Sequence, residues 1–335
     1  MPEYRYDFHG MTLQITTNST DIADAVHSLL RHFPPAGSRQ GRCLEVGLQA
    51  VPDRAAIPIR VSPAARVLLS QTGKAVGDLL RAEWKCTVYR ESRRTICDFH
   101  AQGLLCIDPQ QGQVEGYLVR PEAMRLDIRM SFFHFALTEL LKREGLYTIH
   151  ATALEKEGQG ILIPGYSGQG KTTCCISLLR AGYRYLSDDH PLLRSQGARL
   201  ELLSFPVKID VTEQTIRMFP ELQQAQEKLY SGTQKRYFYP EDFYPQAPVE
   251  RCAPRLLLFP QVMDWPRSRL EVFPKSRALE ELLPHSLLIL DKEVARHQFQ
   301  ILTRLVQQAD CYRLYFGEDV QALPRLLAHL WEQRA

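Results

Sequence analysis

The sequence lacks the features that mark secreted, membrane-spanning and zinc-ribbon proteins. Its first residues contain no basic stretch followed by an apolar run, which a signal peptide requires. No run of about 18 apolar residues occurs, and none of the eight cysteines is spaced as C-x-x-C. We therefore expect a cytoplasmic chain with no membrane partner, whose cysteines remain thiols.

The chain also lacks a strong excess of charge of either sign. Lys and Arg number 41 and Asp and Glu number 38, which gives a formal net charge of +3. A balance this even does not favour a nucleic-acid partner. With 44% hydrophobic residues among 335, the chain has enough apolar material for a sizeable core, and its length suggests two domains.

The first part, residues 1–145, mixes strand and helix patterns. Alternating and apolar stretches predict strands, and periodic apolar positions predict helices, the last of them ending at Gly145. The predicted strands are 11–17, 86–90, 94–100, 103–108 and 114–119, and the predicted helices lie near 21–33, within 63–82 and over 123–143. We expect a smaller α+β domain here, with a role in substrate recognition or oligomerisation.

From residue 146 onward, strands alternate with helices, which predicts an α/β sheet. Strands are predicted over 147–156, 161–165, 183–189, 255–259, 270–273 and 311–315, and helices over 171–182, 277–290, 292–307 and 318–333. The polar and aromatic stretch 211–250 is predicted to be a short helix and a long loop suited to a substrate lid. Residues 146–335 would form the second domain.

The most informative stretch joins the buried strand 161–164 to the helix that begins at Lys171. It matches G-x-x-x-x-G-K-[ST], a phosphate-binding loop whose glycines let backbone N–H groups point at phosphate oxygens. The helix that follows adds its positive N-terminal end. The predicted nucleotide-binding residues are Gly165, Tyr166, Ser167, Gly168, Gln169, Gly170, Lys171, Thr172 and Thr173.

The residue types in this loop predict ATP and Mg²⁺ as ligands. Lys171 supplies an ammonium for the β and γ phosphates, and the Thr172 hydroxyl is an oxygen ligand that suits Mg²⁺. A pair of carboxylates, Asp188 and Asp189, follows the next predicted strand. In an α/β crossover both strand ends meet at the edge where ligands bind, so one Asp is expected to bind the metal and the other to act as general base.

His150 lies on the strand before the loop. The run from His150 through GYSGQGKTT to YRYLSDDH resembles the catalytic domain of HPr kinase/phosphorylase, and more closely the HPr-kinase-like proteins of bacterial peptide-modification clusters. That family shares a nucleotide-binding core with ATP-dependent phosphoenolpyruvate carboxykinases. The resemblance implies a fold of that type for the P-loop domain.

The resemblance also implies phosphotransfer to a hydroxyl, usually of serine, in a peptide, a protein or a small molecule. It assigns Lys171 and the loop to the phosphates, Thr172 and one Asp, with Asp188 as the candidate, to Mg²⁺, and the other Asp to the base, and it leaves open which of Asp188 and Asp189 takes which role. His150 would sit near the γ-phosphate or the base. Partners would be ATP and ADP, the hydroxyl acceptor, and further copies of the chain if it forms a homo-oligomer.

The sequence departs from HPr kinase proper in two places. Thr172-Thr173 replaces the usual Ser-Glu, and no Glu-Ile-Arg-Gly signature follows the Asp pair. The nearest stretch begins at Glu201, which is a candidate for a second metal ligand. Lys208 and Arg255 are further candidates for phosphate binding.

Three other functions remain open on the sequence. An ATPase would use water as the nucleophile and drive a partner. A regulatory module would bind nucleotide without turnover. A carboxykinase-type lyase would need further metal ligands, which the sequence does not show.

Overall fold

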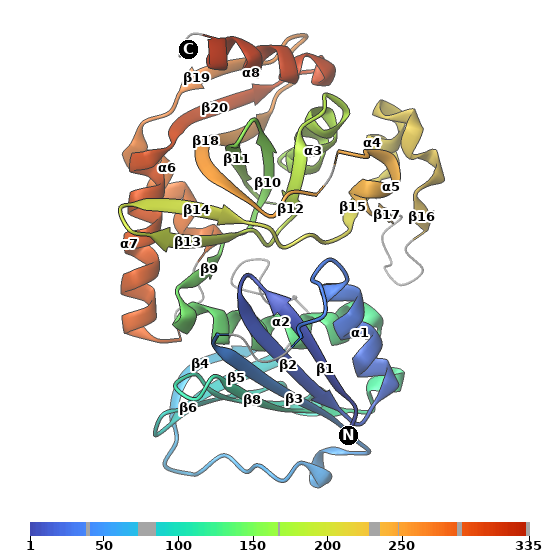
Figure 1. Ribbon diagram of the computed structural model, residues 1–335, viewed down its shortest axis with the longest axis vertical. Coiled ribbons are helices and arrows are strands. Elements are labelled where there is room, and N and C mark those ends of the chain that lie inside the picture. The colour runs from blue at the N-terminus through green and yellow to red at the C-terminus, as the bar shows by residue number, and fades with distance from the viewer. Residues whose placement is uncertain are drawn as a thin grey trace. The chain divides into compact units, whose positions relative to one another are not determined.

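A computed structural model describes residues 1–37, 41–72, 85–166, 168–227, 235–246, 248–286 and 290–332. The chain divides into two compact units (Figure 1). Unit 1 comprises Met1–Leu146 and Leu288–Val294, and unit 2 comprises Tyr147–Leu287 and Ala295–Ala335. We keep the division into an N-terminal and a P-loop domain as a proposal, with one change that concerns residues 288–294.

Ion pairs of Asp291 connect the segment 290–294 to the rest of unit 1. The Asp291 carboxylate is 3.2 Å from Arg90 and 2.5 Å from Arg143 in ion pairs. It also accepts hydrogen bonds from the backbone N–H groups of Glu293 and Val294. Burial alone would raise the pKa of Asp291, but these contacts outweigh it and hold the pKa below its usual value. These residues were expected in the second domain, because sequence spacing does not show such long-range ion pairs.

Unit 1 is built on an eight-stranded mixed sheet with the strand order β1-β2-β3-β8-β7-β6-β5-β4. β3 pairs parallel with β2 and β8, and the other pairs are antiparallel. The strands are β1 (Glu3–Phe8), β2 (Met11–Thr17), β3 (Cys43–Val51), β4 (Arg66–Thr72), β5 (Lys85–Glu91), β6 (Arg94–Asp98), β7 (Gly103–Asp108) and β8 (Gln113–Val119). The five strands predicted in this part of the chain are therefore confirmed, whereas β1, β3 and β4 were not predicted.

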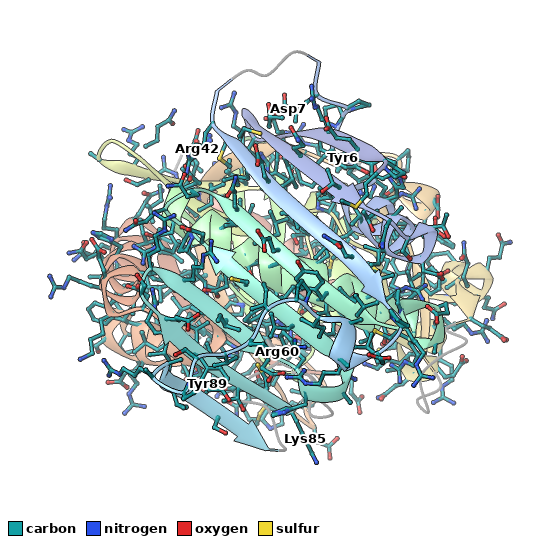
Figure 2. The ribbon with its side chains drawn as sticks, turned by 90° about the horizontal axis from the view of Figure 1, so that it is seen from below. Tyr6, Asp7, Arg42, Arg60, Lys85 and Tyr89 are labelled. Carbon is teal, nitrogen blue, oxygen red and sulfur yellow. The ribbon has the colours of Figure 1, made fainter. Side chains whose placement is uncertain are left out.

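Helices α1 (Thr20–Leu30) and α2 (Leu126–Leu141) pack against each other and against strands of this sheet. The Ser19 hydroxyl caps α1 by accepting from the Ile22 N–H. Gly145 ends the α2 region in the left-handed conformation, as predicted. A segment that includes Arg60 crosses the strands on a face where Ile57 packs with Ile96 (Figure 2).

The helix predicted within 63–82 is wrong over its first part, and residues 73–84 lie outside the described ranges. Residues 66–72 form β4, which completes the edge of the sheet next to β5. A short run of apolar residues such as Val67 to Leu69 fits either period. Pairing with a neighbouring strand decided the outcome.

Unit 2 contains a larger mixed sheet with the strand order β12-β10-β11-β18-β14-β13-β9. β20 pairs with β18, and β19 pairs with β20. Its strands are β9 (Leu146–Thr148), β10 (Ala151–Lys156), β11 (Gln159–Pro164), β12 (Arg184–Ser187), β13 (Leu192–Gln196), β14 (Arg199–Leu203), β18 (Arg251–Val262), β19 (Arg269–Val272) and β20 (Asp310–Phe316). The helices are α3 (Lys171–Arg180), α4 (Glu213–Met218), α5 (Pro240–Phe243), α6 (Lys275–Leu282), α7 (Lys292–Gln308) and α8 (Leu323–Glu332). The mixed α/β class is confirmed.

The long loop predicted within 211–250 is partly wrong. A small sheet forms there from β15 (Ile209–Thr212), β17 (Lys235–Phe238) and β16 (Gln226–Glu227). Phe238 and Tyr244 are buried in the same core cluster as the inner face of α3. These two aromatic residues of the predicted substrate lid are therefore core residues. Tyr230 lies outside the described ranges.

The strand order around β11 decides where the functional residues meet. β10 lies between β11 and β12 and is antiparallel to both. β11 is therefore not paired directly with β12, the strand that precedes the Asp pair. The loop after β11 and the Asp pair nevertheless meet at one edge of the sheet. The reason is that Ala151, at the start of β10, pairs with Pro164, and Ala153 pairs with Ser187. His150, the loop after Pro164 and the Asp pair all leave the sheet at this edge.

Candidate active site

The loop after β11 has the backbone that its glycines predict. Gly168 and Gly170 have φ of 88° and 92°, a region that other residues rarely adopt. A Cβ at Gly170 would also lie 3.3 Å from the Val262 side chain and 3.4 Å from that of Phe316. Glycine is therefore required where the loop enters α3. Ser167, one of the predicted binding residues, lies outside the described part of the chain.

Two hydrogen bonds that involve side chains help to hold the rest of the loop. The Tyr166 N–H donates to the Gln169 side-chain oxygen at 2.6 Å, and the Lys171 ammonium donates to the Gly165 carbonyl at 2.6 Å. A Cβ at Gly165 would come within 2.7 Å of the same Gln169 oxygen. A phosphate that uses the Tyr166 N–H or the Lys171 ammonium must therefore replace these internal partners.

The first turn of α3 provides further donors. Its N-cap is Gly170, which offers no side chain to the N–H groups of that turn. Unmatched N–H groups at a helix start form a ready anion site. Thr172 and Thr173 lie on this turn and are half-buried, whereas Cys174 and Cys175 are fully buried in the core. The turn thus offers backbone donors and the Thr172 hydroxyl at the loop.

Lys171 is at the centre of the charged groups. Its side chain is only 7% exposed, and its ammonium lies 3.3 Å from His150 Nε2 and 3.9 Å from Asp189 Oδ1. His150 Nδ1 lies 3.4 Å from the same Asp189 oxygen. The backbone of His150 is fixed by a hydrogen bond from its N–H to the His285 carbonyl at 2.7 Å. The sequence-predicted residues His150, Lys171 and Asp189 therefore form one cluster.

The two aspartates have different surroundings. Asp188 is 6% exposed and accepts a hydrogen bond from the Thr152 hydroxyl. Burial, together with the charge of Asp189, raises the pKa of Asp188 to about 7, although Thr152, Lys171 and His150 oppose the rise. The side chain of Asp189 is 45% exposed. One carboxylate is thus buried behind the site, and the other faces the open side.

Asp189 has an unusual backbone. Its φ is 71°, the left-handed region that a non-glycine residue adopts only at some cost. The next residue, His190, lies edge-on to the Phe205 ring. Burial and the nearby His150 lower the pKa of His190 to about 3, so this ring is neutral at neutral pH. The turn after β12 therefore directs the Asp189 carboxylate toward His150 and Lys171 by a strained backbone.

The other candidates lie elsewhere. Glu201 pairs with Arg194 at 2.8 Å and is on β14, which pairs with the first residues of β18, away from the loop. Arg255 lies near the same end of β18. The Lys208 ammonium rests 4.2 Å from the centre of the Tyr237 ring. The structure does not bring these three side chains to the phosphate loop.

The residues at the loop suit a magnesium ion better than a zinc ion. Within the described residues, no group of three His, Cys, Asp or Glu side chains could hold a metal. Mg²⁺ is held in kinases by one or two protein oxygens together with phosphate oxygens. The Thr172 hydroxyl and the Asp188 carboxylate are donors of that kind.

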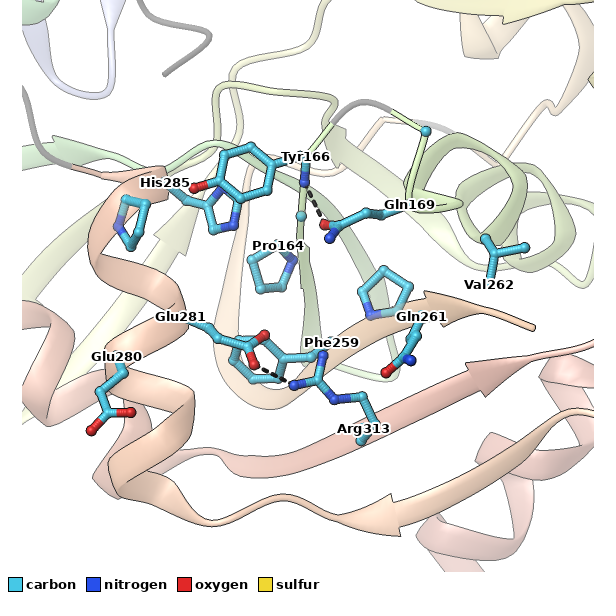
Figure 3. A pocket seen from close by; sticks show the side chains of 14 residues that line it. Pro164, Tyr166, Gln169, Phe259, Gln261, Val262, Glu280, Glu281, His285 and Arg313 are labelled. Atoms are coloured by element: carbon cyan, nitrogen blue, oxygen red, sulfur yellow. Dashed lines mark hydrogen bonds and ion pairs between the residues drawn. The ribbon is translucent and has the colours of Figure 1, made fainter. Parts of the chain in front are cut away.

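A pocket of about 640 Å³ opens beside the loop (Figure 3). It is lined by loop residues, by the end of β18, by the α6 region and by β20, and it includes Tyr166, Phe259, Gln261, Glu280, Glu281 and Arg313. Sequence reasoning missed all but the loop residues, because these side chains come from distant segments and match no motif.

No family model matches the chain. A curated protein, the HPr kinase/phosphorylase of Exiguobacterium sp., is 26% identical over 123 residues. This match supports an HPr kinase-like family for the chain. It covers 35% of the chain and 40% of the length of that relative.

Among solved structures, the Hpr(Ser) kinase/phosphatase from Coxiella burnetii matches 56% of this chain and 99% of that chain. The identity is 13% and the TM-score is 0.29.

No helix in the described ranges has the length and apolar character needed to cross a membrane.

Proposed function

We propose that the chain is an ATP-dependent kinase that transfers the γ-phosphate to a hydroxyl of a peptide, a protein or a small molecule, with serine as the first choice. The observation that carries the proposal is the cluster of Lys171, His150 and Asp189 at the mouth of a glycine loop. The Lys171 ammonium, the His150 ring and the Asp189 carboxylate lie 3.3 to 3.9 Å from one another, measured between the nearest polar atoms of each pair. Phosphoryl transfer needs such positioning and charge more than covalent chemistry.

Each residue has a distinct task in this proposal. The N–H groups of the loop and of the first turn of α3 bind phosphate oxygens. Lys171 exchanges the Gly165 carbonyl for the β and γ phosphates and stabilises the charge that moves between them. Mg²⁺, when bound by Thr172 and Asp188, would neutralise phosphate charge and orient the γ-phosphate.

The geometry favours Asp189 over Asp188 as the base. An acceptor hydroxyl must come within hydrogen-bond reach of the base, and only Asp189 has an exposed carboxylate. His150, next to Asp189, orients that carboxylate and can share its proton. Asp188, which accepts from the Thr152 hydroxyl, would instead serve as the carboxylate ligand of Mg²⁺.

The proposal is tested by incubating the full chain with Mg²⁺, γ-labelled ATP and separate hydroxyl acceptors, including free serine and serine peptides. Mass spectrometry of each acceptor should find one phosphoryl group on a hydroxyl oxygen. Phosphate released at an equal rate with and without every acceptor would instead indicate an ATPase. Tight ATP binding with no product of either kind would indicate a regulatory module.

A further inference from the structure

Thr152 is a buried polar residue of β10 whose side chain reaches Asp188, the candidate metal ligand. Its hydroxyl donates a hydrogen bond to Asp188 Oδ1, and Thr152 is fully buried. A buried hydroxyl needs a partner, and a backbone carbonyl would satisfy it as well as a carboxylate does. Thr152 instead uses its one donor on a carboxylate that the proposed reaction employs. The contact therefore bears on the site as well as on the core.

β10 and β12 lie side by side (Figure 1), and their pairing is irregular next to this contact. Ala153 pairs with Ser187, but the register shifts by one residue between Ala153 and Leu154. Continued by one step, the pairing of Ala153 sets Thr152 opposite Asp188. The register of Leu154 would have set Thr152 opposite Ser187. Irregularities of this kind re-aim side chains next to active sites, and this one aligns the hydroxyl with the carboxylate.

Thr152 lies on the face of the sheet that α3 contacts. Side chains of one strand alternate between the two faces, so Thr152 shares its face with Leu154. Leu154 belongs to the core cluster that contains the inner residues of α3, such as Ile176. The first turn of the same helix carries Thr172, the other candidate oxygen ligand. The Thr152 hydroxyl therefore holds Asp188 on the side of the sheet where this helix begins.

The backbone that leads to Asp188 is fixed by Phe205. The Ser187 hydroxyl donates to the Phe205 carbonyl at 2.6 Å, and the Phe205 N–H donates to the Leu186 carbonyl at 3.1 Å. With the backbone anchored, the side-chain torsions of Asp188 decide where its carboxylate points. The contact with Thr152 restrains these torsions through one oxygen and leaves the second oxygen to accept from another partner or to bind a metal ion.

The two carboxylates of the pair are held by different partners. Asp189 Oδ1 lies 3.4 Å from His150 Nδ1 and 3.9 Å from Lys171 Nζ, and the side chain is 45% exposed. Asp188 is buried and accepts from Thr152. These contacts keep the exposed carboxylate, which suits an acceptor hydroxyl, apart from the buried carboxylate, which suits a metal ion.

We propose that Thr152 is a positioning residue of the magnesium site, where its hydroxyl orients the Asp188 carboxylate for binding the ion. This role rests on the proposed function, in which Asp188 and Thr172 bind Mg²⁺. Thr152 itself belongs neither to the loop motif nor to the Asp pair. Removal of a group that holds a ligating side chain typically lowers metal affinity by roughly 10- to 100-fold.

The test removes the Thr152 hydroxyl and measures how far Mg²⁺ strengthens ATP binding. Thr152→Val and Thr152→Ala remove the hydroxyl, whereas Thr152→Ser keeps it. The matched control is Thr138→Val in α2, which removes another buried hydroxyl, one that donates to the Phe135 carbonyl at 3.0 Å. Each full-length protein is titrated with ATP by calorimetry, once with a chelator and once with Mg²⁺. A thermal melt in the chelator checks that each variant folds.

We expect the unmodified chain, Thr152→Ser and Thr138→Val to bind ATP at least about tenfold more tightly with Mg²⁺ than with the chelator. Thr152→Val should keep the ATP affinity measured with the chelator and lose most of the gain from Mg²⁺, because the orientation of Asp188 is what changes. Thr152→Ala should behave in the same way, and it replaces Thr152→Val in the comparison if the latter does not fold.

An equal gain from Mg²⁺ in the unmodified chain and in the hydroxyl-free variants would overturn the role of Thr152 and leave the proposed function intact. A loss in Thr152→Ser as large as that in Thr152→Val would also overturn it, as would failure of both hydroxyl-free variants to fold. An unmodified chain that binds ATP without any gain from Mg²⁺ would overturn it as well. Failure of the unmodified chain to bind ATP at all would overturn the proposed function, and the role of Thr152 with it.

Discussion

Lys171 Nζ lies 3.9 Å from Asp189 Oδ1, although the two residues follow strands that do not pair with each other. The first residue belongs to the loop after β11 and the second to the turn after β12. His150, just before β10, contacts both. The residue that precedes the antiparallel strand between β11 and β12 thus lies between the two side chains that those strands bring to this edge.

The first prediction concerns Lys171. Lys171→Met keeps the buried stem and removes the ammonium that lies beside Asp189. We expect phosphotransfer to fall by at least about 100-fold, because a group that stabilises developing charge is lost. Thermal unfolding should change little, since Met fills the same space. The measurement is product formation by mass spectrometry alongside a thermal melt, and turnover above a tenth of the original rate would refute this role.

A second prediction follows from the burial of Asp188. Its folded pKa of about 7 lies above the ordinary aspartate value of 3.8. The free energy of unfolding is therefore highest while Asp188 is protonated, and it falls as the pH rises from the ordinary value through about 7. In metal-free buffer, Asp188→Asn should be more stable than the unmodified chain, and its Asn oxygen can still accept from Thr152. The advantage should grow between about pH 5 and pH 8.

The measurement for Asp188 is a series of thermal melts across that pH range with a chelator present. We expect a rise in Tm of at least about 3 °C at the alkaline end. The matched control is Asp264→Asn on the exposed surface, which should show no such trend. A gain that is constant with pH, or a loss at alkaline pH, would contradict the assigned burial.

Much of the candidate site could be predicted from short, contiguous stretches of the sequence. The loop, the helix from Lys171 and the strand before the Asp pair are contiguous, and each has a strong local signal in its glycines or its apolar pattern. The long-range pairings had no such signal. The position of β10, the strand at 66–72 and the ion pairs of Asp291 depend on partners far along the chain, as do Gln261 and Glu280 in the pocket.

A third prediction separates loop geometry from general strain. Gly170→Ala and Gly182→Ala both place a side chain at positive φ, with φ of 92° and 83°. Each should cost about 1–2 kcal/mol of unfolding free energy. Only at Gly170 would the new Cβ press on Val262 and Phe316, whereas nothing lies within 4 Å at Gly182.

We therefore expect Gly170→Ala to lose ATP affinity by at least about tenfold and Gly182→Ala to keep it. The measurement is isothermal titration of each variant with ATP in the presence of Mg²⁺. The physical reason is that the first N–H groups of α3 must point at the phosphates. Equal ATP affinity in the two variants would show that the turn at Gly170 does not shape the phosphate site.

A fourth prediction concerns Asp291, which joins residues 288–294 to unit 1. Asp291→Asn keeps an oxygen for the Glu293 and Val294 N–H groups but removes the charge that Arg90 and Arg143 bind. We expect a loss of about 1 kcal/mol of unfolding free energy at pH 7, measured by urea denaturation. Because the folded pKa is lowered, this contribution is present above the ordinary aspartate value of 3.8 and is lost as the pH falls through the lower folded pKa.

The loss caused by Asp291→Asn should accordingly shrink as the buffer becomes more acidic. A double variant with Arg143→Gln serves as the control, because removing both partners should cost less than the sum of the two single changes. Strictly additive costs would show that the ion pair contributes nothing to unit 1.

The central claim is that the γ-phosphate passes to an acceptor hydroxyl beside Asp189 and Lys171. It is tested most directly by running the reaction in ¹⁸O-labelled water with the best acceptor and following all phosphate products by mass spectrometry. The account predicts a phosphorylated acceptor whose phosphoryl oxygens carry no label from the solvent, and its loss in Lys171→Met. Labelled inorganic phosphate as the main product, with the acceptor unmodified, would contradict it.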